Sequence, residues 1–190
     1  MLATTERRGP LSGAFQSLAA LSAVAALVMH SHSLGQDPVG LFGAAESGNV
    51  AMVKTELQRG VDVNTRDNVF GLTALHYAAH AGHREVAQFL LDAGANVNVT
   101  SRQADVTPLH IAVCQGHIDV VELLVEKGAH VNAADDRGYT PLDMAVKRIR
   151  LAGESGLMSG HGQERYEAIA VLLQKHGGKT GKGLRQQDVK

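Results

Sequence analysis

The chain has 190 residues, enough for one ordinary domain with a buried core. Its 18 basic and 19 acidic residues leave a net charge of -1, so no overall field would attract nucleic acid or an acidic membrane. Aromatic residues make up only 4% of the chain, and a single cysteine excludes an intrachain disulfide or a thiolate cluster.

Residues 1–35 have the composition of a targeting segment. Arg7 and Arg8 precede a low-charge run from 14 to 29, and Ser33 and Gly35 supply small residues after it. This order predicts a secretory signal peptide cleaved after Gly35, and therefore an exported protein, periplasmic or secreted. The apolar core of the run is shorter than the roughly 20 residues of a spanning helix. A membrane anchor that stays uncleaved and a cytoplasmic protein are the open alternatives.

Beyond residue 38 the chain repeats itself. The segment from Thr107 to His117 has a counterpart 34 residues upstream, from Thr73 to His83, and a further copy starts 33 residues downstream at Thr140. The segments that follow, 86–98 and 120–132, also match each other. This period and the Thr-Pro-Leu-His core are similar to the ankyrin repeat. The chain resembles that family over residues 38–178, and its ending resembles those of bacterial ankyrin proteins.

The resemblance implies an all-α solenoid of four helix-turn-helix units joined by β-hairpin loops. The units are expected at 38–68, 69–103, 104–136 and 137–178. Phe42 takes the place of the motif histidine in the first unit, as suits a unit that caps a stack on one side. The loop of the third unit has Asp105 where the family usually has glycine.

The motif residues have structural tasks in this fold. The Thr107 hydroxyl and the His110 imidazole are expected to bond to each other and to the backbone around them. Pro108 fits the first helical turn, where its missing N–H is not needed. Gly82 and Gly116 are expected to end the first helix of their units in a left-handed conformation.

The fourth unit departs most from the repeat. Asp143 replaces the motif histidine, and an insertion near 149–163 separates the two helices. We interpret its glycine-rich part, 153–162, as a mobile loop, with a functional loop as the alternative. Residues 179–190 are expected to form a flexible tail.

Three histidines could suggest a metal site. His76, His80 and His83 are spaced so that one helical face could present all three. Since His76 and His83 are motif positions, structural roles are favoured. The alternative is a metal- or ligand-binding enzyme that uses His80, His83 and His161. We predict no catalytic residue, no metal and no cofactor.

A surface for a protein partner is the remaining prediction. In ankyrin proteins, partners are bound by the hairpin tips and by exposed positions at the end of each first helix, along the concave helix face. Carried onto this chain, these positions include Arg66, Asn68, Phe70, His80, Arg102, Gln103, Cys114, Gln115, Asp135, Arg137, Tyr139 and Lys147. We therefore expect a monomer that binds a protein, without catalysis and without nucleic acid. If residues 1–35 are retained, the alternative is a membrane-tethered adaptor.

Overall fold

The computed structural model describes residues 39–155 and 161–185. The chain divides into two units, 1–36 and 37–190, and all described residues belong to the second. The proposed signal or anchor at 1–35 therefore lies outside the described residues. No helix in the described ranges is both long enough and apolar enough to cross a membrane.

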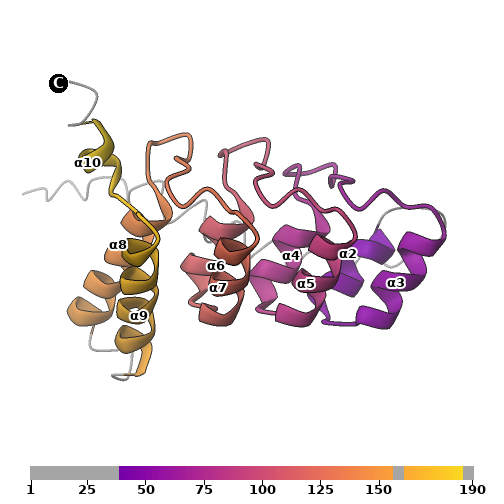
Figure 1. The fold of residues 1–190 in the computed structure, drawn as a ribbon, viewed down its shortest axis with the longest axis horizontal. Helices are drawn as coiled ribbons and strands as arrows, with labels where there is room; N and C mark the ends of the chain where they lie inside the picture. Colours follow the sequence, from indigo (N-terminus) through magenta and orange to yellow (C-terminus); the bar gives the residue numbers. More distant parts are fainter. Residues whose placement is uncertain (1–38, 156–160, 186–190) are drawn as a thin grey trace, which may run out of the picture. The chain divides into compact units, whose positions relative to one another are not determined.

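The second unit is a stack of antiparallel helix pairs (Figure 1). The helices are α2 (Val39–Glu46), α3 (Val50–Gln58), α4 (Ala74–Ala81), α5 (Arg84–Asp92), α6 (Pro108–Gln115), α7 (Ile118–Glu126), α8 (Pro141–Ser155), α9 (His161–Lys175) and α10 (Gly181–Arg185). The first helices α2, α4, α6 and α8 contact one another in order, as do the second helices α3, α5, α7 and α9. The predicted all-α solenoid of four units is confirmed.

The loops between the units show no β-strand. No residue in the described ranges lies in a strand. Each loop is closed at its base by a backbone hydrogen bond, as from Asp67 N to Leu72 O at 2.7 Å and from Ser101 N to Val106 O at 2.9 Å. One such bond does not make a strand ladder, so the β-hairpin form of the loops is not confirmed.

The motif residues begin and end the first helices as predicted. Thr107 caps α6: its hydroxyl accepts from His110 N at 3.4 Å, and its backbone N–H donates to His110 Nδ1 at 3.2 Å. Gly82 and Gly116 close α4 and α6 with φ of 79°, a left-handed conformation that glycine adopts without steric cost.

Buried histidines join each unit to the next. Because Nδ1 of His76 accepts from Thr73 N, Nε2 carries the proton and donates to Val106 O at 3.1 Å, in the following loop. His110 repeats the bond to Tyr139 O at 3.2 Å. Both imidazoles are 0% exposed. The structural role predicted for these two motif histidines is confirmed.

A second row of bonds runs between the helix ends. His83 Nε2 donates to Glu46 O, and His117 Nε2 donates to His80 O, each at 3.0 Å. In the last unit the hydroxyl of Tyr166 donates to Cys114 O at 3.0 Å and takes the place of the histidine. The insertion hides this equivalence from the sequence.

A third row uses the asparagines that close each unit. Asn64, Asn98 and Asn132 each donate from Nδ2 to a glycine carbonyl of the next unit, at 3.0–3.2 Å. Each Oδ1 accepts a backbone N–H from the residue two positions after that glycine. The stack is therefore held by three polar rows around its apolar core.

The first unit replaces a core leucine by a carboxylate. Leu90 and Leu124 are fully buried, whereas Glu56 occupies the corresponding position of α3 and is 9% exposed. Its carboxyl group lies beside Gly40 at the start of α2 and pairs with Arg59 Nη1 at 2.8 Å. A negative charge is favourable at a helix N-terminus, where backbone N–H groups are unpaired. No repeat precedes this unit among the described residues.

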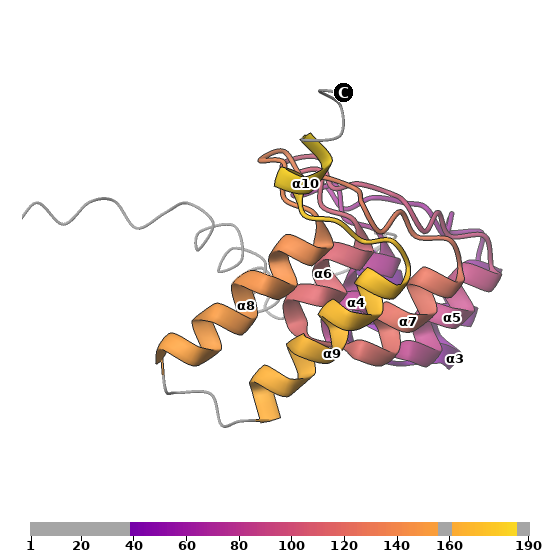
Figure 2. The same cartoon turned by 60° about the vertical axis from the view of Figure 1, so that its left-hand side comes forward.

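The fourth unit is more helical than predicted. Both α8 and α9 have 15 residues, against eight and nine in α6 and α7. Residues 153–155 and 161–162, expected in a glycine-rich loop, belong to these helices, and 156–160 lie outside the described residues. Figure 2 shows α8 and α9 continuing past the ends of α6 and α7. The insertion therefore mainly lengthens a helical hairpin.

The expected flexible tail is wrong for residues 179–185. Lys179 N donates to Asn132 Oδ1, and Thr140 Oγ1 donates to Lys179 O, both at 2.7 Å. Gly181 N donates to Asp143 Oδ2 at 2.7 Å, directly before α10. Asp143 occupies the position of the histidines that bind the next unit elsewhere in the stack, and here it holds the segment that leads into α10.

Candidate partner-binding surface

The loop tips form one hydrogen-bonded layer along an edge of the stack (Figure 1). Arg102 N donates to Phe70 O at 2.8 Å, and Gln103 Nε2 donates to Val69 O at 3.2 Å. Asp136 N donates to Ala104 O at 3.1 Å and links the next pair of loops. The tips are thus held in register before any partner arrives.

Carboxylates give two of the loops a fixed shape from inside. Asp67 is buried, and its two oxygens accept backbone N–H groups from four successive residues, 69–72, at 2.6–3.1 Å. It also accepts the hydroxyl of Tyr77 at 3.2 Å. Burial, and then the charge of Asp67, raise the pKa of Tyr77 above its usual range. Asp135 accepts N–H groups from Arg137 at 3.0 Å and Tyr139 at 2.8 Å.

The structure separates the predicted tip residues into outward and inward ones. Asn68, Arg102, Gln103, Arg137 and Tyr139 are exposed, Tyr139 to 44%. Val69, at the same loop tip as Asn68, is 63% exposed. We call the six residues the loop-tip row: Asn68, Val69, Arg102, Gln103, Arg137 and Tyr139.

Three predicted contacts have other tasks in the loops. Arg66 is half-buried, and its Nη1 donates to Gly71 O at 3.0 Å and to Thr100 O in the next loop. Phe70 is half-buried and gives its carbonyl to the bond with Arg102. Asp135, also half-buried, is used by its own turn. These three side chains therefore present less surface to a partner than the residues of the loop-tip row do.

The prediction that Cys114 faces a partner is wrong. The side chain is 5% exposed, and its Sγ lies 3.1 Å from Met144 Sδ. Burial raises the pKa of the thiol to about 11, so it stays protonated and unreactive at neutral pH. Helix α8 packs on α6 and covers this position. Neighbouring Gln115, as predicted, is partly exposed.

The histidines proposed for a metal site are used differently. His83 already donates to Glu46 O, and the side chain of His161 is outside the described residues. His80 is half-buried, its Nε2 has no hydrogen-bond partner, and burial and then the charge of His117 lower its pKa. No group of three metal-binding side chains occurs in the part of the chain that the structure describes.

Aromatic rings support two cations on α8. Lys147, half-buried, has its Nζ 6.0 Å from the centre of the Tyr139 ring. The guanidinium of Arg148 lies 5.9 Å from the centre of the Tyr166 ring. Such contacts hold a long basic side chain in place without neutralising its charge. Lys147 therefore adjoins the loop-tip row at Tyr139.

Comparison with known families agrees with this architecture. A family model described as "Ankyrin repeats (3 copies)" matches residues 41–135 and again residues 102–181. A search of curated proteins gives no significant match. The two matched ranges together span most of the chain and all four helix pairs. The chain therefore belongs to the ankyrin repeat family, whose repeats are generally protein–protein interaction modules.

Proposed function

We propose that the protein is a non-catalytic module that binds a protein partner through the loop-tip row and the adjoining ends of the first helices. The observation that supports this most is the combination of exposure and rigidity in the loops. Val69 and Tyr139 are large and exposed, yet their backbones are fixed by Asp67 and Asp135. Apolar and aromatic side chains of this kind concentrate binding energy at interfaces.

Preorganisation is the second support. Ordering a flexible loop on binding costs free energy that must be recovered from the contacts. Here three bonds between neighbouring loops, from Arg102 N, Gln103 Nε2 and Asp136 N, fix the tips without a partner. Four repeats offer only a modest contact area. A surface that is already ordered loses less free energy on binding, so this area can be enough.

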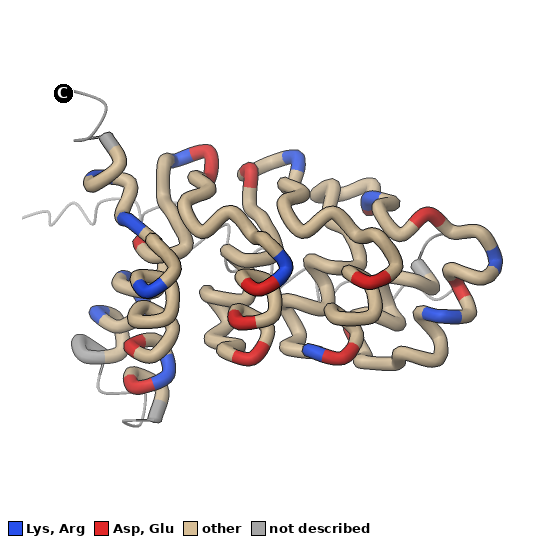
Figure 3. Tube along the Cα trace, viewed as in Figure 1, with Lys and Arg blue, Asp and Glu red and all other residues tan. Residues whose placement is uncertain are grey.

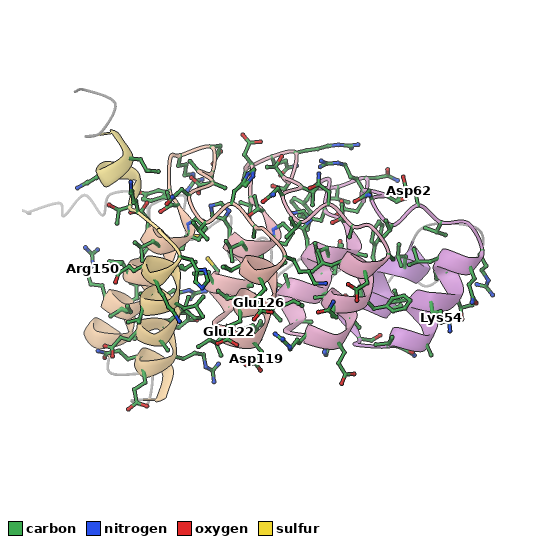
Figure 4. All side chains as sticks on the ribbon, in the orientation of Figure 1. Lys54, Asp62, Asp119, Glu122, Glu126 and Arg150 are labelled. Atoms are coloured by element: carbon green, nitrogen blue, oxygen red, sulfur yellow. The ribbon has the colours of Figure 1, made fainter. Side chains whose placement is uncertain are left out.

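Site-specific photocrosslinking tests the proposal in the full-length chain. A benzophenone amino acid is placed singly at Asn68, Gln103 and Arg137, and as a control at Glu122. Glu122 is exposed on α7, away from the loops (Figure 4). After irradiation in an extract of the source cells, crosslinked proteins are identified by mass spectrometry. The same partner at all three tips and not at Glu122 supports the proposal, whereas equal capture at Glu122 contradicts it.

We also propose that residues 1–35 direct export and are then removed. The support is the order of Arg7 and Arg8, the apolar run, and the small residues Ser33 and Gly35. N-terminal sequencing of the mature protein from its source should begin at Gln36. A sequence that begins at the original N-terminus would instead favour a membrane-tethered adaptor or a cytoplasmic protein.

A further inference from the structure

The near-zero net charge of the chain hides a division along the stack. Between residues 39 and 140 there are seven basic and twelve acidic residues, whereas residues 141–185 hold eight basic and four acidic ones. Figure 3 shows basic positions gathered on α8, α9 and the segment up to α10, and acidic positions along α7. The first three units are thus negative and the fourth is positive.

Lys147 of the fourth unit stands next to the loop-tip row at Tyr139, and Arg148 follows it on α8 beside Tyr166. We call Tyr139, Lys147 and Arg148 the basic corner. Neither Lys147 nor Arg148 forms an ion pair with any described carboxylate, since the described pairs are Arg59–Glu56, Lys127–Asp92 and Arg137–Asp136. Nε of Arg148 is buried without a hydrogen-bond partner.

Two carboxylates of the same loop and unit, Asp135 and Asp143, bond to other donors and not to these cations. Asp143 accepts from Thr140 N at 2.9 Å and from Gly181 N at 2.7 Å. Asp135 accepts from two N–H groups of its own turn. Both Lys147 and Arg148 act on the Cys114 thiol, where their charges oppose the effect of burial on its pKa. The two cations therefore share one neighbourhood near Cys114, and neither is paired directly with a described carboxylate.

The position of Tyr139 in the repeat explains why its side chain is exposed. Leu72 and Val106 hold the corresponding positions in the preceding loops, and they are 4% and 9% exposed because the next unit covers them. No further repeat follows the fourth unit among the described residues, and Tyr139 is 44% exposed. An apolar platform thus lies directly beside Lys147.

We propose that the basic corner receives an acidic segment of the protein partner, with carboxylates meeting Lys147 and Arg148 and an apolar side chain on Tyr139. This inference rests on the proposed function and adds the chemistry of the partner. Tyr139 belongs to both surfaces, so a partner seated on the loop tips reaches the corner. Charge-assisted hydrogen bonds to carboxylates are among the stronger polar contacts.

The charge division favours a protein segment over nucleic acid. A nucleic-acid strand carries a phosphate at every nucleotide, and its extension along the stack would meet the acidic first three units. A protein segment can confine its carboxylates to the length of the basic corner and so avoid the acidic units. A second copy of this chain could offer the exposed carboxylates of Asp119, Glu122 and Glu126 on α7, and the experiment below includes that outcome.

Peptide binding to the full-length chain tests the inference. The probe is a fluorescein-labelled peptide of alternating Glu-rich and Leu-rich turns, and its match has Gln at every Glu. By fluorescence anisotropy at low salt, the Glu peptide should bind about tenfold more tightly than the Gln peptide, and added salt should remove the difference. Equal affinities for the two peptides, or binding of neither, would overturn the inference.

Variants locate the site. Lys147→Gln should weaken binding of the Glu peptide several-fold, and Lys147→Arg should restore it. Lys54→Gln on α3 removes the same charge from an exposed position of the first unit (Figure 4) and should change nothing. Equal losses in both Gln variants would mean a nonspecific charge effect and overturn the inference. Arg148→Gln is the second variant, accepted only if circular dichroism shows a native melting curve.

Two further measurements test whether nucleic acid or a second copy of the chain binds the basic corner instead. Duplex DNA that displaces the Glu peptide at equal concentration would assign the corner to nucleic acid. Sedimentation at low salt that shows a dimer lost in Lys147→Gln would assign it to a second copy. Either result overturns the inference. If the loop tips crosslink one partner while the two peptides bind equally, the inference fails and the proposed function stands.

Discussion

The imidazole of His110 donates from Nε2 to the backbone carbonyl of Tyr139 at 3.2 Å. The imidazole is fully buried, whereas the Tyr139 side chain is 44% exposed in the loop-tip row. One bond thus connects the core of the third unit to an exposed residue of the proposed interface. The ordering of the surface and the stability of the stack therefore have a common origin.

Acid should destabilise the stack through its buried histidines. Burial lowers the pKa of His76 from 6.5 to about 4, and it lowers the pKa of His110 as well. Since the unfolded chain takes up these protons first, stability is complete above pH 6.5 and is lost as pH falls toward 4. For His76 alone the loss is about 3 kcal/mol. Urea unfolding at neutral and at mildly acidic pH measures it.

Substitution identifies the titrating group. His76→Gln should be less stable at neutral pH and should lose less on acidification. His130→Gln is the matched control, because the His130 side chain is exposed and its removal should leave the pH dependence unchanged. An unchanged slope in His76→Gln would show that the acid sensitivity has another source.

Removing one hydroxyl should weaken the last unit. Tyr166→Phe deletes the O–H that donates to Cys114 O at 3.0 Å and leaves a buried carbonyl without this donor. We expect a loss of about 1–2 kcal/mol in the free energy of unfolding. Tyr139→Phe is the control, since no described residue hydrogen-bonds to that hydroxyl, and it should be neutral. Chemical denaturation of both variants decides, and equal effects would contradict the assigned role of Tyr166.

A glycine should stabilise the second tip of the row. Asp105 has a positive φ of 50°, in the left-handed region. Among the described residues, every other residue with a positive φ is a glycine. The corresponding residues of the neighbouring loops are Gly71 and Gly138, with φ of 68° and 77°. Asp105→Gly should therefore raise the melting temperature, with a gain of about 0.5–1 kcal/mol.

The sign of the change is the test. Asp136→Gly, at an exposed position of the next loop without positive φ, should lower stability because glycine gains freedom in the unfolded chain. If both glycine variants are destabilised, the left-handed conformation at Asp105 costs nothing.

The thiol of Cys114 should be unreactive while the protein is folded. Its 5% exposure and a pKa of about 11 limit both access and thiolate. Ellman's reagent at slightly alkaline pH should label the native protein slowly and the urea-unfolded protein at once. Fast labelling of the native protein, with a normal melting curve, would restore Cys114 as a surface residue.

The sequence was sufficient for the parts of this protein that depend on local pattern. The repeat period predicted the helix pairs, and Thr107, His110 and Gly116 predicted how α6 begins and ends. These residues act within one unit or at a fixed distance from the next, so their spacing carries the information. The structural role of His76 and His110 followed for the same reason.

Only the tertiary structure decided which side chains face outward. Cys114 and Arg66 occupy positions that the family exposes, yet α8 covers the first and neighbouring carbonyls bind the second. The insertion in the fourth unit shifted the register, so Tyr166 could not be recognised as the counterpart of His117. Burial and pairing are set by units more than thirty residues away, and a repeat pattern fixes the scaffold without fixing what its neighbours cover.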